Sequence, residues 1–332
     1  MTFTDKEKLK KLDDTIALNY RFTHIQAQYL EYYPELITKD MIDEMIGGTD
    51  ITEKEAVVAI LAGAFALDNS NKEEDRLLAR KYLARSVQIL DTQKYTDDPY
   101  YKNVAPPAVK DGSWEIKWES YPAYRASICA EMLTDTDHTE IAPLGFFNSD
   151  FTFPAVLEDG NEWMTLTPID VDTVQDAIRD ANGKVITFGL GLGYYAYMTA
   201  RKENVLSVTV VEKSEKVIEL FKKHILPRFE CADKIKIIHA DAFEYAENEM
   251  PKEDYDYAFV DTWRDASDGL PMYEKMKKLE YLSPNTEFSY WIESYILSRK
   301  RAQKYEILRE KVDTGAQDAP KTYAEFIEEL YK

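Results

Sequence analysis

The spacing of apolar residues separates a helical first part of the chain from a second part in which strands and helices alternate. From Thr4 to about Leu90, apolar positions recur at three- and four-residue steps, which is the period of amphipathic helices. Turn signals that predict breaks between these helices occur at Tyr33-Pro34, Gly47-Gly48 and Asp68-Asn69-Ser70-Asn71. We therefore predict a mainly helical N-terminal domain over residues 1–138.

The longest apolar run extends from Ala56 to Leu67. It is far shorter than the roughly 20 residues that a membrane-spanning helix needs. Thr52 and Glu55 precede it with the spacing of a capping box, which predicts a buried helix. The charged start, Met1 to Lys11, lacks the apolar centre of a signal peptide. We expect a cytoplasmic protein that has no contact with a membrane.

The second part begins with a β-rich segment, Ile141 to Thr167, which contains an Asp159-Gly160-Asn161 turn typical of a hairpin. A helix is expected to follow as far as about Ala181. Short apolar strands separated by helices are then predicted at Lys184–Phe188, Ser207–Val211, Ile235–Ile238, Tyr257–Val260 and Phe288–Ile292.

Strands and helices that alternate at this spacing imply right-handed crossovers and a parallel, doubly wound sheet. We therefore predict an α/β fold of the Rossmann-like kind over residues 139–312, with a sheet that stops at five strands. Residues 313–332 are expected to form a helical tail.

A glycine-rich loop and three carboxylates follow the predicted strands. Gly189, Gly191 and Gly193 come directly after the first strand, where the missing side chains allow a ligand to approach the backbone. Glu212 ends the second strand, 19 residues after Gly193, where a carboxylate can accept hydrogen bonds from ribose hydroxyls. Asp241 follows the third strand, where it can accept from the exocyclic amine of a base while Ala242 donates its N–H.

This ordered set resembles the cofactor signature of class I S-adenosylmethionine-dependent methyltransferases over about Lys184 to Glu293. The resemblance implies S-adenosylmethionine as cofactor, with the three glycines at its methionyl part, Glu212 at the ribose and Asp241 at the adenine. A nicotinamide dehydrogenase is disfavoured because Tyr194 occupies the position of the last small residue in its Gly-x-Gly-x-x-Gly motif. The alternative for these residues is a tight turn and solvated strand-end caps.

The fourth strand is followed by Asp261-Thr262-Trp263-Arg264-Asp265, where the acceptor of a methyl group is expected. Asp261 and Asp265 are the candidate catalytic residues, which would orient an amine or hydroxyl or remove its proton. Helix capping is the alternative role for either carboxylate. Tyr194 and Trp263 are candidate aromatic contacts of the ligand, with simple packing as their alternative.

Two further family resemblances bear on this loop. It is similar to the Asp-x-Trp-Lys-Asp loop of catechol-type O-methyltransferases, with Arg264 in the lysine position. In those enzymes the first Asp holds magnesium, and Glu293 would be the second ligand here, but we assign no metal site. The sheet and the acidic loop also resemble the polyamine aminopropyltransferases, for which Glu162, Asp170, Asp261, Asp265 and Asp268 would suit a cationic amine.

Composition narrows the possible partners. The 332-residue chain has 41 Lys and Arg against 61 Asp and Glu, a net charge of −20, which disfavours nucleic acid and leaves a small-molecule substrate. Two cysteines and four scattered histidines offer no metal cluster. The helical N-terminal domain is expected to cover the cofactor and select the acceptor. A ligand-binding module without catalysis remains the alternative to an enzyme, and the oligomeric state is left open.

Overall fold

The computed structural model describes residues 3–67 and 72–332, which form two compact units. Unit 1 comprises residues 1–89, 124–146 and 294–332, and unit 2 comprises residues 90–123 and 147–293. The chain therefore contributes several separate segments to each unit. The Asp68–Asn71 turn predicted from the sequence lies outside the described residues.

A five-stranded parallel sheet forms the centre of unit 2. Its strands are β10 (Gly183–Phe188), β11 (Val205–Glu212), β12 (Ile235–His239), β13 (Tyr257–Val260) and β14 (Glu287–Tyr290). Their spatial order is β12-β11-β10-β13-β14, and every neighbouring pair is parallel. The predicted doubly wound Rossmann-like sheet and its limit of five strands are confirmed.

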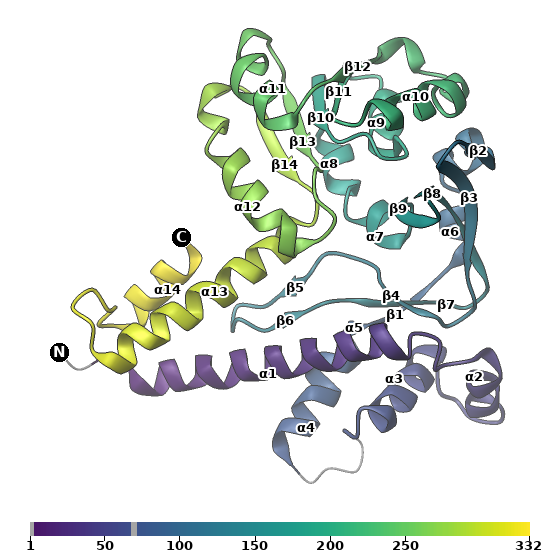
Figure 1. Ribbon diagram of the computed structural model, residues 1–332. Helices are drawn as coiled ribbons and strands as arrows, with labels where there is room; N and C mark the ends of the chain where they lie inside the picture. Colours follow the sequence, from purple (N-terminus) through teal and green to yellow (C-terminus); the bar gives the residue numbers. More distant parts are fainter. Residues whose placement is uncertain (1–2, 68–71) are drawn as a thin grey trace. The chain divides into compact units, whose positions relative to one another are not determined.

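Both faces of this sheet are covered by helices, which explains why its central strands are mostly apolar. Figure 1 shows α9 and α10 on one side of the sheet and α11 and α12 on the other. Every residue of β13 is buried. The bounds of the covering helices are α9 (Tyr194–Ala200), α10 (Glu215–His224), α11 (Ala242–Asn248) and α12 (Ala266–Lys277).

Strand order reverses around β10, because β11 lies on one side of it and β13 on the other. The register places Phe188 beside Val211 and Val260, so β10 and β13 end level with each other and β11 extends one residue further, to Glu212. In an open α/β sheet, ligands bind beyond the carboxyl ends of the strands at such a reversal. The fold therefore brings the loops after β10, β11 and β13 together.

A second, antiparallel sheet of order β2-β3-β8-β9 precedes the parallel sheet in unit 2. The predicted β-rich segment is confirmed by the pairing of β8 with β9, after which short helices lead into β10. The elements of this part are α6 (Thr92–Thr96), the π-helical turn η2 (Tyr100–Val104), β2 (Val109–Asp111), β3 (Trp114–Tyr121), β8 (Phe151–Glu158), β9 (Asn161–Thr165), α7 (Pro168–Asp172) and α8 (Gln175–Asp180).

Unit 1 is mainly helical. Thr52 and Glu55 form the capping box predicted for α3. A core of apolar residues joins α1 to the two C-terminal helices, with Leu12, Leu308 and Phe326 buried in it. The helices of this unit are α1 (Lys6–Tyr32), α2 (Lys39–Ile46), α3 (Glu53–Ala64), α4 (Glu73–Leu77), the π-helical η1 (Leu78–Leu83), α5 (Ala84–Ser86), α13 (Glu293–Thr314) and α14 (Tyr323–Tyr331).

Unit 1 also contains short strands. They are β1 (Val87–Leu90), β4 (Ala126–Ile128), β5 (Leu133–Thr134), β6 (Glu140–Ile141) and β7 (Leu144–Phe147), paired in the orders β1-β7-β4 and β5-β6. The two units differ from the domain boundaries predicted at residues 138 and 312. Residues 90–123 belong to unit 2 with the parallel sheet, whereas the C-terminal helices pack with α1 in unit 1.

Candidate functional site

A cavity of about 500 Å³ opens at the carboxyl ends of the parallel strands in unit 2. This volume lies within the roughly 300–1,000 Å³ that small-molecule pockets usually span. Its lining comprises Glu162, Trp163, Met164, Thr165, Asp170, Gly189, Leu190, Gly191, Val211, Glu212, Lys213, Asp241, Ala242, Phe243, Asp261, Thr262, Trp263, Arg264, Met272 and Trp291. Residues from the ends of β10, β11 and β13 and from the start of α11 therefore meet at one site.

The glycine loop forms one wall of this cavity. Gly189 has φ of +104°, and a Cβ there would lie only 1.9 Å from the carbonyl oxygen of Asp261. A Cβ on Gly191 would lie 2.2 Å from the Met164 sulfur. The Asp261 carbonyl therefore requires glycine at position 189, before any ligand is considered. At Gly191 the neighbour is the flexible end of Met164, and it is the φ of +49° that favours glycine.

Glu212 is buried at the end of β11, and each of its carboxylate oxygens accepts a backbone N–H. Leu190 N donates to Oε2 at 3.1 Å, and Ser214 N donates to Oε1 at 2.7 Å. A carboxylate has about four lone-pair sites. Glu212 thus stays able to accept two hydroxyl hydrogens while it fixes the glycine loop.

Asp241 is the N-cap of α11. Its Oδ1 accepts from Phe243 N at 3.0 Å and Glu244 N at 3.2 Å, and its Oδ2 lies 3.4 Å from Lys213 Nζ. Burial raises the pKa of Asp241, but these amides and Lys213 outweigh it and hold the pKa below its usual value. As the first residue of the helix, Ala242 has an N–H without an acceptor in its own helix, and it lines the cavity.

Asp261 follows β13 and is half-buried in the cavity wall. Its backbone N donates to Phe188 O at 2.8 Å, which ties it to the end of β10. Among the described residues, its carboxylate has no hydrogen-bond or ion-pair partner. Burial, together with the nearby charges of Asp170 and Glu212, raises the pKa of Asp261 to about 8.

Asp265, the second candidate catalytic residue, forms the N-cap of α12 and is absent from the residues that line the cavity. Its Oδ1 accepts from Ser267 N at 2.6 Å and Asp268 N at 3.3 Å, and its own N–H donates to Asp268 Oδ1 at 3.0 Å. Hydrogen bonds from Ser267 lower its pKa. These contacts give Asp265 a capping role, and its catalytic role stays a prediction.

The predicted aromatic contacts take different positions. Trp263 lines the cavity, stacks on Tyr290 with centroids 6.3 Å apart, and donates from Nε1 to Trp291 O at 3.3 Å. Tyr194 is buried, and its hydroxyl donates to Asp98 Oδ2 at 3.0 Å. Neither Tyr194 nor Gly193 is among the described residues that line the cavity, so their contact with a cofactor stays a prediction.

The antiparallel sheet supplies cavity residues that were not predicted for the cofactor site. Trp163, Met164 and Thr165 come from β9, and Trp291 comes from the segment after β14. Thr262 also lines the cavity, and its hydroxyl is buried without a hydrogen-bond partner among the described residues. For the residues of β9, the only sequence signal was the predicted hairpin, which did not indicate which strand faces the cavity. Thr262 lies in the loop where the acceptor was expected, and Trp291 lies in the predicted fifth strand.

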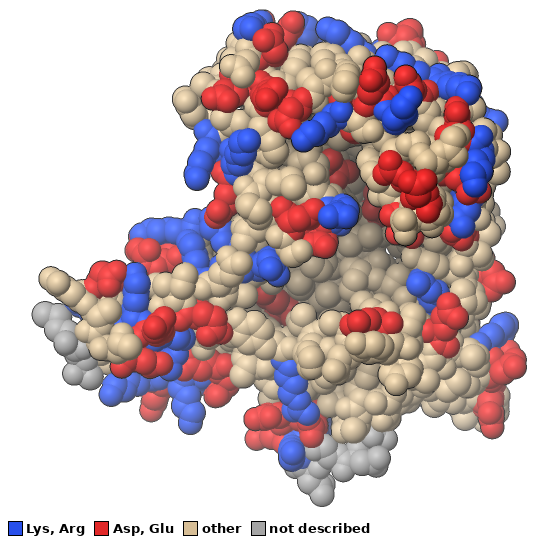
Figure 2. Space-filling view, in the orientation of Figure 1, with Lys and Arg blue, Asp and Glu red and all other residues tan. Residues whose placement is uncertain are grey.

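Carboxylates outnumber cations among the residues that line the cavity, although Glu162 is exposed like the two cations. Glu162, Asp170 and Asp261 have no cationic partner among the described residues. Lys213 and Arg264 line the cavity too, but their side chains are 80% and 89% exposed. Over the face shown in Figure 2, acidic and basic side chains are interspersed. The cavity therefore favours a cationic group over an anionic one.

Within the described ranges, no group of three or more His, Cys, Asp and Glu side chains has the arrangement of a metal site. Glu293, considered above as a magnesium ligand, accepts a hydrogen bond from Tyr273 Oη at 2.6 Å and does not line the cavity. None of the helices in residues 3–67 and 72–332 is long and apolar enough to cross a membrane.

Comparisons with known proteins give structural likeness only. No family model and no curated protein matches the chain. Among solved structures, the spermidine synthase from Thermotoga maritima is 17% identical at a TM-score of 0.32, with 46% of this chain and 55% of that chain covered. A spermidine synthase in complex with the transition-state analogue AdoDATO gives the same identity and score, with 46% and 54% covered.

A human methyltransferase 10 domain containing protein is 14% identical at a TM-score of 0.27, with 35% of this chain and 59% of that chain covered. This chain thus matches little more than half the length of each of these structures. The fold is established by the strand order described above.

Proposed function

We propose that this chain is an S-adenosylmethionine-dependent methyltransferase that acts on a small-molecule acceptor. One observation carries the proposal: the glycine loop, Glu212 and Asp241 stand at three successive strand ends around a single cavity. Chance placement of one carboxylate is common, but an ordered set at one sheet edge is typical of a nucleotide site. The end of β13 adds Asp261 to the same cavity.

The hydrogen-bonding and charged groups of the cavity match the ribose, the adenine and the sulfonium of this cofactor. Two backbone amides hold Glu212, and its carboxylate keeps further lone pairs that can accept hydrogen bonds from ribose hydroxyls. Asp241 and the free N–H of Ala242 are an acceptor and a donor for the edge of an adenine. The uncompensated carboxylates of the cavity suit a positively charged sulfonium.

When bound, S-adenosylmethionine supplies an electrophilic carbon on its sulfonium. The chain has to align an acceptor with it and receive the acceptor's proton. Asp261 is the group that we assign to the second task, because its carboxylate lines the cavity and has no partner in residues 3–67 and 72–332. Trp263 and Trp291 contribute apolar wall that excludes water from this end of the cavity.

Aminopropyl transfer is the second candidate function, and the charge of the cavity favours it. Glu162, Asp170 and Asp261 suit a cationic amine acceptor. Among the described residues that line the cavity, the two cations, Lys213 and Arg264, are exposed, so neither is a buried partner for the carboxylate of intact S-adenosylmethionine. The decarboxylated cofactor lacks that carboxylate. The two candidates therefore differ in the form of the cofactor that binds more tightly.

Isothermal calorimetry with four ligands tests the proposal. S-adenosylmethionine and S-adenosylhomocysteine should bind and NAD should not. Intact S-adenosylmethionine should bind at least as tightly as its decarboxylated form. A clear preference for the decarboxylated form would reverse the order of the two transferases, and tight binding of NAD would exclude both.

A further inference from the structure

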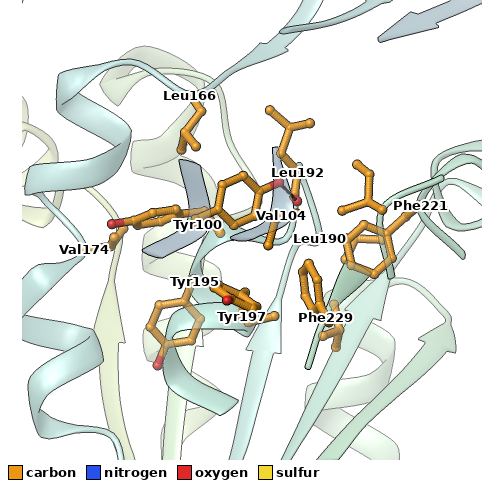
Figure 3. Close-up of a cluster of buried hydrophobic side chains, with 14 of the residues drawn as sticks. Tyr100, Val104, Leu166, Val174, Leu190, Leu192, Tyr195, Tyr197, Phe221 and Phe229 are labelled. Carbon is orange, nitrogen blue, oxygen red and sulfur yellow. Dashed lines mark hydrogen bonds between the residues drawn. The ribbon is translucent and has the colours of Figure 1, made fainter. Parts of the chain in front are cut away.

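The glycine loop is held from outside the parallel sheet by a tyrosine of η2. Tyr100 is completely buried, and its Oη donates to Leu192 O at 2.5 Å. Figure 3 shows Tyr100 and Leu192 in one cluster with Tyr197 and Phe229. The Tyr100 ring lies 5.8 Å from Tyr197 and 6.4 Å from Phe229, centroid to centroid. The hydroxyl therefore reaches the loop from a closely packed position.

The two parts of the glycine loop face different surroundings. Gly189, Leu190 and Gly191 line the cavity, whereas Leu192 is buried and does not. Leu190 N is bound by Glu212, and Gly193 N donates to Leu190 O at 2.8 Å. A buried carbonyl without a donor is costly, so the Leu192 carbonyl needs the Tyr100 hydroxyl to keep its orientation.

The turn that carries Tyr100 is itself fixed to the helix after the loop. Asp98 Oδ1 accepts from Tyr100 N at 2.8 Å, and Asp98 Oδ2 accepts from the Tyr194 hydroxyl at 3.0 Å. Ala105 N donates to Tyr100 O at 3.1 Å and so closes the π-helical turn. Ala105 has a φ of +36°, a strained value for alanine. Such turns are frequent at functional sites, and strain of this kind persists only where neighbouring contacts enforce it.

We propose that Tyr100 is a positioning residue for the cofactor-binding loop and sets cofactor affinity through the Leu192 carbonyl. This inference rests on the proposed function, because it takes the glycine loop as part of the cofactor site. Tyr100 does not line the cavity, so it acts through the loop. It gives residues 90–123 a role in the nucleotide site.

The adjacent tyrosine is a matched control. Tyr101 comes from the same turn, is also buried, and donates from Oη to Leu166 O at 2.7 Å. Its acceptor lies between β9 and α7, outside the glycine loop. Tyr100→Phe and Tyr101→Phe therefore remove the same hydroxyl from the same turn, but only the first releases the loop.

Two measurements on the full chain decide the proposal. Hydrogen exchange without ligand should be roughly 5- to 150-fold faster at residues 189–193 in Tyr100→Phe, the range that one unmade buried hydrogen bond allows. Affinity for S-adenosylhomocysteine should decrease by a factor in the same range. Tyr101→Phe should change both by less than about twofold, well below that range.

Each other outcome overturns either this proposal or the proposed function, and the two are distinguishable. Wild-type protein that fails to bind S-adenosylhomocysteine contradicts the proposed function, while hydrogen exchange still tests the loop contact. Unchanged exchange in Tyr100→Phe, or equal losses in both variants, contradicts the role of Tyr100. A Tyr100→Phe protein that fails to fold while Tyr101→Phe folds assigns the hydroxyl to general stability and contradicts it as well.

Discussion

The ends of β11 and β13 flank the same central strand, yet they hold their carboxylates in opposite ways. Both oxygens of Glu212 are bound by backbone amides, whereas the carboxylate of Asp261 has no partner among the described residues. Burial and neighbouring carboxylates raise the pKa of Asp261 to about 8. A carboxylate fixed by amides suits the binding of hydroxyls. One left without a partner suits a cation or a proton.

The strongest test of this contrast is Asp261→Asn. Removing a general base should lower turnover by about 10²–10⁴-fold, while affinity for S-adenosylmethionine should change little. Because the carboxyl of the free protein titrates at about pH 8, wild-type kcat/KM should rise with pH up to about 8 and the residual activity of the variant should not. Steady-state kinetics with an acceptor found by screening measures both. A large loss of affinity would make Asp261 a binding residue.

The raised pKa of Asp261 also predicts how the stability of Asp261→Asn depends on pH, which can be measured without a substrate. A carboxyl whose pKa is higher in the folded than in the unfolded state stabilises the fold at low pH. It loses that contribution as the pH rises through the folded value, here about 8. The Tm of Asp261→Asn relative to wild type should therefore be higher at pH 9 than at pH 5. A Tm difference independent of pH would contradict the raised pKa.

A smaller effect is expected from Glu212→Ala. The loss of hydrogen bonds to a charged acceptor should weaken S-adenosylmethionine binding by about 1–3 kcal/mol, measured by calorimetry. Glu215→Ala is the control because Glu215 is an exposed carboxylate in the first turn of α10, outside the cavity. Equal affinities for wild type and Glu212→Ala would remove the ribose role and with it the contrast between the two strand ends.

The smallest effect is expected at Asp265. Because its carboxylate caps α12, Asp265→Ala should lower the free energy of unfolding by about 0.5–2 kcal/mol and leave turnover unchanged. Asp265→Ser, which keeps an N-cap acceptor, should recover most of this loss in denaturant unfolding. A drop in turnover at unchanged stability would instead support the catalytic role.

Strand ends and their order were predictable because alternating strands and helices permit few arrangements of a parallel sheet. The positions of Glu212, Asp241 and Asp261 at the sheet edge follow directly from that order. The separate roles of Asp261 and Asp265 could not be predicted from the strand order, although the spacing of Asp265 and Asp268 matches a capping box. That signal favoured the cap over catalysis.

Contacts between segments far apart in sequence were not predictable. Met164 reaches Gly191 only because β9 pairs with β8 in a sheet whose register depends on long-range packing. Tyr100 reaches Leu192 from a π-helical turn that has no apolar period. The helical periodicity ends at about Leu90, and no local pattern in residues 90–123 indicated that they pack with the parallel sheet of unit 2 rather than with the helical domain predicted over residues 1–138.

The division of the chain restricts how the protein can be taken apart. The polypeptide passes from one unit to the other after Ile89, Ala123, Phe146 and Glu293. A gene fragment that starts at residue 139 would encode every strand of the parallel sheet but would lack the π-helical turn and half of the antiparallel sheet. Isolating unit 2 requires a new linker from Ala123 to Phe147, with the chain started near Leu90 and stopped near Glu293.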